Sequence, residues 1–489
     1  MLYSHKERMF PNMVKIKSTA RTHFQMVYKW FLVSAVLLFA FFHVCLTFTR
    51  HYFTPENMMF SSDSFMIAMK VDRWYALCLI LATIVYLFVY KRHSFRAWDK
   101  LKSGQNKVLS KEWIVLLIMQ IWYIICCWVY SRTYSNYFQT YDWFLFDFAA
   151  CALFFFPLAL AVGHHKIQKY VDILLHVIII ISTGFIVWAL WNLFHLNIVT
   201  LPNGLPLGMT QEYTFYPGVN ENIGAAIGTS MVMISLYMIA THRWPIKLLY
   251  FIVMLPHLFA TLLTGSRANF LALFIAFTLF SFMLVWNKTK MQSVLRCILL
   301  STAAAVAAGA AIVYFRTGVF QLFDYITNLS SYISASPEIN AHDSLLHDSG
   351  RLPIWYASLK MMVSSIRTFF FGYPIFDISQ IIKDTLIQLY GSGSAKAHAH
   401  NIILQTGLVM GIPGMLMFIA FLVMMVFRCV RVGIGKAKGN LHGAYVLPII
   451  ILTFIVVNMF EPFLLFYCSI MACLFFFFCG WIIAIDRDQ

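Results

Sequence analysis

The sequence predicts an all-α polytopic membrane protein with about twelve transmembrane helices and a large outer loop between helices 9 and 10. The composition is 61% hydrophobic and only 11% charged, whereas a soluble domain carries about 25% charged residues. The mean hydropathy is +0.74. Apolar runs recur along the chain, most of them about 17–25 residues long, which is enough to cross the hydrocarbon core of a bilayer. Residues 1–489 are therefore expected to form a single integral membrane domain.

Twelve apolar runs account for this prediction. The first run has no Ala-x-Ala cleavage site and is long enough to span, so we expect it to remain as a helix rather than to act as a cleaved signal peptide. The boundaries at 265–268 and 463–464 are expected to be tight turns. In chain order, the predicted spans are 31–49, 74–90, 113–130, 143–163, 170–194, 222–240, 248–265, 268–286, 297–315, 402–427, 444–463 and 464–485.

The formal charge of +16 is explained by membrane orientation rather than by nucleic-acid binding. Basic residues concentrate in short connections such as 91–112 and 428–442, and cytoplasmic connections of membrane proteins carry this excess. Both termini are therefore predicted to be cytoplasmic. All ten cysteines lie in or beside apolar runs, so we expect neither a disulfide framework nor a CxxC metal site.

The long connection at 316–400 is predicted to lie on the outer face. Apolar residues recur at near-helical spacing over 352–371, which predicts an amphipathic helix on or in the outer membrane surface. The polar stretch 330–349 is predicted to be a flexible lid.

Three polar motifs fall on the outer side. They are Thr264-Gly265-Ser266-Arg267-Ala268, Ser349-Gly350-Arg351 with Trp355, and His398-Ala399-His400-Asn401. Polar groups at a bilayer boundary are costly and often mark function. Their combination indicates an enzyme that handles an anionic, lipid-borne substrate.

The two arginines are candidate phosphate ligands, because a guanidinium offers two parallel hydrogen bonds to an oxyanion. Arg267 has the alternative of snorkelling to the surface, and Arg351 that of a loop arginine paired with Asp348. Trp355, one turn later, is open to two interpretations, an interface anchor or a platform for a sugar ring.

His400 is the candidate reacting centre, since an imidazole can accept a hydroxyl proton near neutral pH. Asn401 is expected to orient either this ring or the substrate, and His398 to support it. His-x-His can supply half of a metal site. No third or fourth ligand is evident in the sequence, so we expect no metal and no cofactor.

Three further polar residues mark the outer helix ends. Asn222 is predicted to be either an N-cap or a sugar-binding group. Glu221 and Glu461 are interpreted as interfacial residues, with contact to sugar or acceptor hydroxyls as the alternative.

These motifs together resemble those of O-antigen ligases and O-antigen or capsule polymerases. Thr-Gly-Ser-Arg-Ala at 264–268, Ser-Gly-Arg at 349–351 and Ala-His-Asn at 399–401 carry the resemblance. Gly411-Ile412-Pro413-Gly414 adds a small-residue segment that follows the histidine motif. The resemblance covers about 250–425.

The resemblance implies a C-type glycosyltransferase-like fold in the bacterial cytoplasmic membrane, with the active site on the outer face. It implies a glycan on undecaprenyl diphosphate as donor, an acceptor glycan or glycolipid, and metal-independent chemistry. His400 and Arg267 would be catalytic and Arg351 would bind the diphosphate. The extra histidines His342 and His347 in the loop depart from the family pattern, which leaves the acceptor open.

Three functions remain open at this point. The preferred one is a ligase that moves a finished glycan onto a final acceptor with inversion at the anomeric carbon. The alternative is a polymerase of lipid-linked repeats. The third is a transporter or flippase, which would be expected to show two related halves; no duplicated pattern is visible.

Overall fold

The computed structural model describes part of the chain. The predicted spans 31–49 and 74–90 lie outside the described residues, as do nearly all of 143–163 and 297–315, the loop residues 316–350, and Gly265. The described residues are 110–131, 164–195, 197–200, 206–209, 215–217, 221–264, 266–289, 351–375, 377–391, 398–434, 445–465 and 470–488, with single residues at 156, 159 and 306.

Within these residues, five helices are long and apolar enough to cross a membrane. The prediction of a helical membrane protein is therefore confirmed for the described part. Three shorter apolar helices accompany them: α11 (Arg267–Thr289), α19 (Val446–Asn458) and α20 (Ile470–Asp488). The five long helices are α5 (Lys111–Ser131), α8 (His164–Phe194), α9 (Glu221–Thr241), α10 (Ile246–Leu263) and α18 (Ile402–Ile434).

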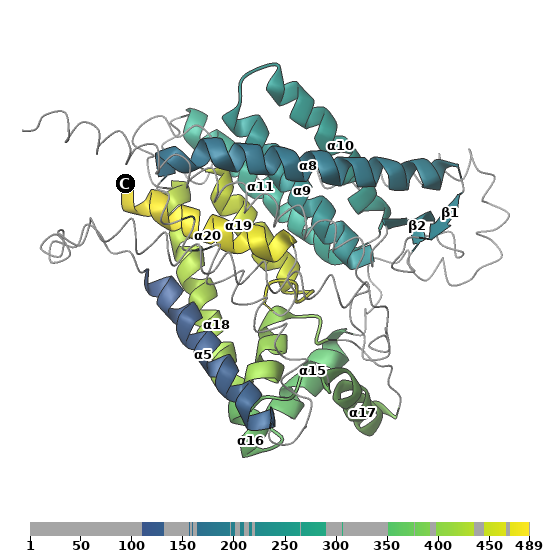
Figure 1. The fold of residues 1–489 in the computed structure, drawn as a ribbon, viewed down its shortest axis with the longest axis vertical. Helices are drawn as coiled ribbons and strands as arrows, with labels where there is room; N and C mark the ends of the chain where they lie inside the picture. The colour runs from purple at the N-terminus through teal and green to yellow at the C-terminus, as the bar shows by residue number, and fades with distance from the viewer. Residues whose placement is uncertain are drawn as a thin grey trace, which may run out of the picture.

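The all-α prediction missed a small sheet between α8 and α9. Strands β1 (Ile198–Thr200), β2 (Pro206–Met209) and β3 (Phe215–Pro217) form an antiparallel sheet in that order. The sheet lies beside the last turns of α8 (Figure 1), and Leu207 packs into a cluster with apolar residues of α8 and α10. Strands of three or four residues are too short to produce a recognisable alternating pattern.

Helix α9 forms the centre of the helical array. Almost all of its side chains are buried, and it packs against α10 along its length. A Cβ atom at Gly228 would lie only 2.1 Å from Oγ1 of Thr261 on α10, so the glycine is what permits this close approach.

An ionic cluster joins α5, α18 and α20 at the end of the molecule predicted to face the cytoplasm. Nε of Arg428 lies 2.9 Å from Glu112 Oε1, and its Nη1 contacts Asp486 Oδ2. Nε of Arg431 lies 2.9 Å from Asp486 Oδ1. Both carboxylates are buried, so the arginines neutralise charges that water cannot reach.

Three short helices cover the opposite end: α15 (Arg351–Met362), α16 (Ile366–Phe371) and α17 (Ile378–Tyr390). They lie in the lower part of Figure 1, beside the lower ends of α5 and α18. The prediction of a single amphipathic helix at 352–371 was wrong, because α15 ends at Met362 and α16 begins at Ile366. Ser365 caps α16 through a capping box with Thr368, and a serine with this hydrogen bond starts a new helix rather than continuing an old one.

Helix α18 differs from the predicted span at 402–427. It extends to Ile434 and is broken at Gly411, which has φ 68° and ψ −179°. The break divides α18 into a short limb, 402–410, and a long limb, 412–434. The N–H of Tyr373 donates to the carbonyl of Leu408 on the short limb, and a Cβ at Gly411 would lie 2.3 Å from the carbonyl oxygen of Phe370. The end of α16 and the residues after it therefore pack directly against α18 at Gly411.

The predicted tight turn at 463–464 is also corrected. Helix α19 ends at Asn458 and α20 begins at Ile470. The first residues of this connection fold inward, and those from Glu461 to Leu465 are buried.

Candidate functional site

The carboxylate of Glu461 gathers three basic side chains from distant parts of the sequence. Its Oε1 lies 3.1 Å from Nη2 of Arg351 and 3.0 Å from Nδ1 of His400. Its Oε2 lies 3.7 Å from Nε2 of His398. Glu461 itself is 2% exposed. We refer to these four residues as the Glu461 cluster.

Backbone hydrogen bonds hold Glu461 in this place. The N–H of Glu461 donates to the carbonyl of Val457 in the last turn of α19. Oδ1 of the buried Asn458 accepts the N–H of Phe463 at 2.8 Å, so it closes the turn around the glutamate. Nδ2 of Asn401 donates to the carbonyl of Met459 at 3.0 Å, which fixes the turn to the start of α18.

The histidine motif forms a tight turn immediately before α18. Oδ1 of Asn401 accepts the N–H groups of Ile403 and Leu404 at 2.9 and 3.1 Å, as an N-cap does. Asn401 is thus engaged by backbone on both sides and fixes the turn rather than the His400 ring. His400 adopts φ 50°, in the left-handed region, which is uncommon for residues other than glycine although Asn, Asp and His enter it more often than most. Such strained backbone persists only where surrounding contacts enforce it.

Hydrogen bonds assign the protons of the two rings. The backbone N–H of His400 donates to Nδ1 of His398 at 3.2 Å, so a neutral His398 carries its proton on Nε2, toward Glu461. His400 Nδ1 lies at hydrogen-bond distance from a carboxylate oxygen, so that nitrogen carries a proton. In the neutral ring this leaves the lone pair on His400 Nε2.

Burial and charge set the ionisation of this cluster. Burial lowers the pKa of His398 to about 3, and the nearby charges of His400 and Arg351 act in the same direction; His398 is therefore neutral at pH 7. Burial alone would raise the pKa of Glu461, but the hydrogen bond from His400 and the positive charges around the carboxyl outweigh it, and the pKa lies below its usual range. Glu461 is therefore an anion.

Three side chains of the Glu461 cluster are close enough together to be ligands of a metal ion. Ligand atoms of His398, His400 and Glu461 lie within 4.8 Å of one another, so the expectation that the histidines lack a third partner was wrong. Two features oppose a cation here. Nε2 of His398 carries a proton, as argued above, and a metal ligand nitrogen must offer its lone pair. The guanidinium of Arg351 already occupies Oε1 of the carboxylate.

Arg351 begins α15 and reaches the cluster across Phe460. Its guanidinium carbon lies 5.6 Å from the centre of the Phe460 ring, within the range of a cation–π contact. The Trp355 ring centre lies 6.3 Å from the same phenyl ring. Nε1 of Trp355 is buried and has no hydrogen-bond partner among the described residues.

A second group of polar residues joins α9 to α11. Thr229 Oγ1 donates to Oδ1 of Asn269 at 3.0 Å, and Nδ2 of Asn269 donates to Ser266 Oγ at 3.0 Å. Ser266 Oγ in turn donates to Oδ1 of Asn222 at 2.9 Å. The N-cap interpretation of Asn222 was wrong, because α9 begins at Glu221 and Asn222 lies inside the helix.

Arg267 is the first residue of α11 and half-buried. Helices α11 and α19 pack along their lengths, and the rings of Phe280 and Tyr445 lie 6.3 Å apart at one end. Thirteen residues of helix, about 20 Å, separate that contact from Arg267 on α11 and from Asn458 on α19. Arg267 therefore lies at the same level as the turn that carries Glu461.

Of the residues predicted for the site, the structure gathers Arg351, His398 and His400, with Asn401 and Trp355 adjacent. It places Asn222 with Ser266, next to Arg267, in the neighbouring α9–α11 group. Sequence reasoning missed the central role of Glu461, which it treated as interfacial. The only signal was an acidic residue in Phe-Glu-Pro between two apolar runs.

The middle of the chain is similar to a known protein family. Residues 249–419 match the family model described as O-antigen ligase. Over these residues the chain is similar to the O-antigen ligase family. The ligase segment contains Arg267, Arg351 and His400 but ends before Glu461, so the anion of the cluster comes from beyond it. The family implies a membrane enzyme of glycosyltransferase type. No curated protein matches the chain.

Proposed function

We propose that the protein transfers a glycan from a polyprenyl diphosphate carrier to an acceptor hydroxyl at the outer face of the cytoplasmic membrane. The hydrogen bond between His400 and the buried Glu461 carboxylate is the observation that carries this proposal. A carboxylate on Nδ1 orients an imidazole so that Nε2 accepts a proton. The arginines beside it suit a diphosphate.

The proposed reaction is a single displacement. His400 Nε2 takes the proton from the acceptor hydroxyl while the hydroxyl oxygen forms a bond to the anomeric carbon of the glycan. The bond from that carbon to the diphosphate oxygen breaks, and the lipid diphosphate leaves with the electron pair. The configuration at the anomeric carbon is inverted. The proton on His400 then passes to water.

Each member of the site has a defined task in this scheme. Glu461 stabilises the imidazolium that forms on His400. Arg351 and Arg267 stabilise negative charge on the departing diphosphate. Because Arg351 also contacts Glu461, an arriving diphosphate competes for the same guanidinium. The Trp355 indole N–H and the Asn222 amide are proposed to contact the glycan or the diphosphate, and His398 to maintain the turn. No metal ion takes part.

The ligase form of this reaction is favoured over the polymerase form because the matching family model is described as O-antigen ligase. The two forms differ in acceptor, not in bond chemistry. A buried acid–base pair with an adjacent guanidinium is also better suited to group transfer than to lipid flipping.

A complementation experiment tests the proposal. Cells lacking the protein receive the wild type or His400→Asn, and lipid-linked and surface glycans are analysed separately. Asparagine tolerates the left-handed backbone at this position but cannot act as a base. We expect long glycans to accumulate on the carrier with His400→Asn, while membrane levels of the protein match the wild type. Surface glycans that stop at one repeat would instead identify a polymerase, and full transfer by His400→Asn would refute the proposed base.

A further inference from the structure

The histidine turn before α18 is held by a side chain that the proposed reaction does not use. Oε1 of Gln405 accepts the N–H of Ala399 at 2.9 Å. Ala399 lies between the two histidines of the Glu461 cluster, and both Ala399 and Gln405 are fully buried, at 0% exposure. This hydrogen bond ties the first turns of α18 to the segment that precedes the helix.

The hydrogen bond also orients the Gln405 amide. The N–H of Ala399 is a donor, so the amide oxygen faces it and Nε2 points elsewhere. Among the described residues, this Nε2 has no hydrogen-bond partner. A buried amide with one end unsatisfied costs free energy that an apolar side chain of the same length would not cost. The benefit of this amide therefore lies in what its bond to Ala399 fixes rather than in the packing of the short limb.

The bond to Ala399 fixes one side of the turn, and Asn401 fixes the other. The N–H of Ala399 belongs to the peptide plane that begins at the carbonyl of His398, so its direction determines where both histidine side chains leave the backbone. Nδ2 of Asn401 holds the far side at the carbonyl of Met459. The backbone of His400 lies between these two fixed points, and its φ of 50° is the conformation that connects them.

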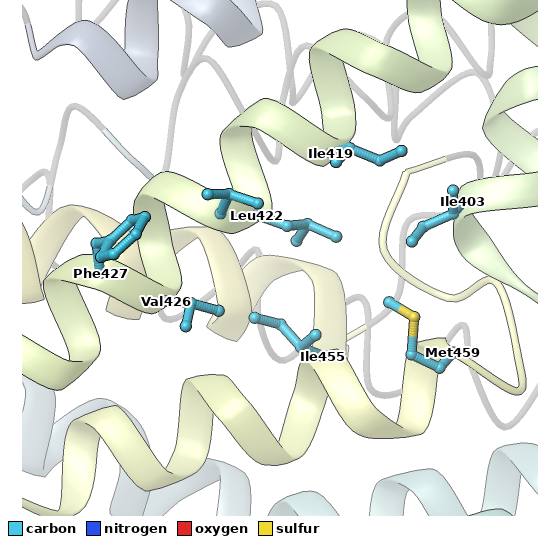
Figure 2. Close-up of a pocket in the computed structure, with 8 residues that line it drawn as sticks. Ile403, Ile419, Leu422, Val426, Phe427, Ile455 and Met459 are labelled. Atoms are coloured by element: carbon cyan, nitrogen blue, oxygen red, sulfur yellow. The ribbon is translucent and has the colours of Figure 1, made fainter.

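The other neighbours of the short limb do not hold the turn in this way. Ile403 and Met459 line a groove between α18 and α19, and Figure 2 shows their side chains pointing into it. All the side chains that line the groove are apolar, so they offer no strong hydrogen bond to the turn. Thr406 is as buried as Gln405 but donates to the carbonyl of Ile402 within its own helix. Gln405 differs from these residues because its side chain reaches out of α18.

We propose that Gln405 is a positioning residue for His400, and that its amide holds the left-handed turn in which the imidazole meets Glu461. This inference rests on the proposed function, since it assumes that His400 is the base. Strained backbone persists only where its surroundings enforce it, so loss of the bond to Ala399 lets the turn relax and carries the imidazole away from Glu461. A displacement of about 1 Å at a reacting group costs about 100-fold in rate.

Gln405→Met tests this role, because methionine is unbranched and of similar length but offers Ala399 no strong acceptor. We expect kcat for glycan transfer to fall about 100-fold. Donor KM should change little, because Arg351 is placed by α15 and by Glu461 rather than by the turn. Thr406→Val is the matched control, since it removes a buried hydrogen bond within α18 only, and both constants should stay those of the wild type.

Two further substitutions separate the hydrogen bond from general damage to the fold. Gln405→Glu keeps an acceptor oxygen at the same reach, whether its carboxyl is ionised or protonated, and should recover most of the lost kcat. Gln405→Asn keeps the amide but is one methylene shorter, so it should lose kcat as Gln405→Met does. A purely structural role predicts a different result, in which thermal stability falls but kcat per folded protein is unchanged in all three variants.

Hydrogen exchange measures the state of the turn without requiring transfer. The purified full chain in lipid nanodiscs is compared with Gln405→Met. We expect the backbone amides of residues 398–404 to exchange faster in the variant, and those of residues 446–458 on α19 to be unchanged. Equal exchange of residues 398–404 in the two proteins would overturn the proposal, as would an equal increase in both segments.

The outcomes distinguish this proposal from the proposed reaction. If His400→Asn abolished transfer while Gln405→Met kept the full kcat, the positioning role would be wrong and the base would stand. If His400→Asn transferred as well as the wild type, the proposed base would be wrong, and the positioning role of Gln405 would fall with it.

Discussion

Nδ1 of His400 donates a hydrogen bond of 3.0 Å to Oε1 of Glu461, a residue 61 positions later in the chain. The same oxygen lies 3.1 Å from the guanidinium of Arg351. One carboxylate oxygen therefore serves both the proposed base and the proposed diphosphate ligand. The protonation of His400 and the binding of an anion at Arg351 are linked through this atom.

Glu461→Gln should keep the shape of the site but remove its charge. We expect kcat to fall about 100-fold, the lower end of what a positioned general base contributes. The acidic limb of the pH–rate profile should move to lower pH, because the imidazolium of His400 loses a neighbouring anion. The measurement is transfer from a lipid-linked donor between pH 5 and 9.

Glu461→Asp is the matched control for that experiment, since it retains the negative charge. It should recover part of kcat and return the profile toward that of the wild type. If Glu461→Gln lowered activity with no change in the profile, the role of Glu461 would be structural only.

Acid should destabilise the protein through this cluster. The pKa of His398 falls from 6.5 to about 3 on folding, so between these values the unfolded chain takes up a proton that the folded ring refuses. Stability then decreases as the pH falls, by up to about 1.4 kcal/mol per pH unit. Glu461 acts in the same direction. Its pKa lies below 4.5, so the stability it contributes is present above pH 4.5 and is lost as the pH falls through its folded value.

Thermal unfolding in detergent between pH 7 and 4 measures this effect. His398→Gln should flatten the curve relative to the wild type. Substitution of the exposed His195 by Gln should leave the slope unchanged, and a similar flattening there would remove His398 as the cause.

Arg351→Lys should weaken donor binding while preserving charge. Lysine cannot give the two parallel hydrogen bonds of a guanidinium to a phosphate, so we expect the donor KM to rise about tenfold. The exposed Arg367, which lies over the ring of Tyr130, offers the comparison Arg367→Lys, for which KM should not change. An unchanged KM in Arg351→Lys would place the diphosphate elsewhere.

Arg428→Met should destabilise the fold without altering donor KM. It removes the partner of the buried Glu112 carboxylate and one partner of Asp486, and an uncompensated buried charge costs about 3–5 kcal/mol. Arg431→Met is the control, because Arg431 is 71% exposed at the same carboxylate and exposed pairs contribute at most about 1 kcal/mol. Denaturant or thermal unfolding compares the two, and equal losses would contradict this assignment.

The sequence was sufficient for the long apolar helices that the structure describes and for the two local motifs at 351–355 and 398–401. Apolar runs of membrane length and polar groups beside them are local signals, and most of the predicted site residues meet or adjoin one another. Glu461 was beyond such reasoning, because its partners are set by how the turn after α19 folds against the start of α18. Its burial cannot be read from Phe-Glu-Pro alone.

The break in α18 was partly foreseeable. Glycine and proline at 411–414 disfavour an uninterrupted helix, but the pattern does not state the direction of the bend. That direction depends on α16, whose backbone occupies the space beside Gly411. The prediction at 352–371 failed for a similar reason. The apolar residues keep a helical spacing across Ser365, but Ser365 caps α16 and so separates it from α15.

The contact of Gly411 with Phe370 also defines where hybrid proteins can be joined. One end of α15 is tied to Glu461 through Arg351, and the segment after α16 is tied to Leu408 through Tyr373. Residues 351–373, the histidine turn and the Glu461 turn therefore form one unit of exchange. Crossovers placed before residue 351 and after residue 465 keep that unit intact, whereas a crossover between them pairs a histidine from one parent with a carboxylate from another.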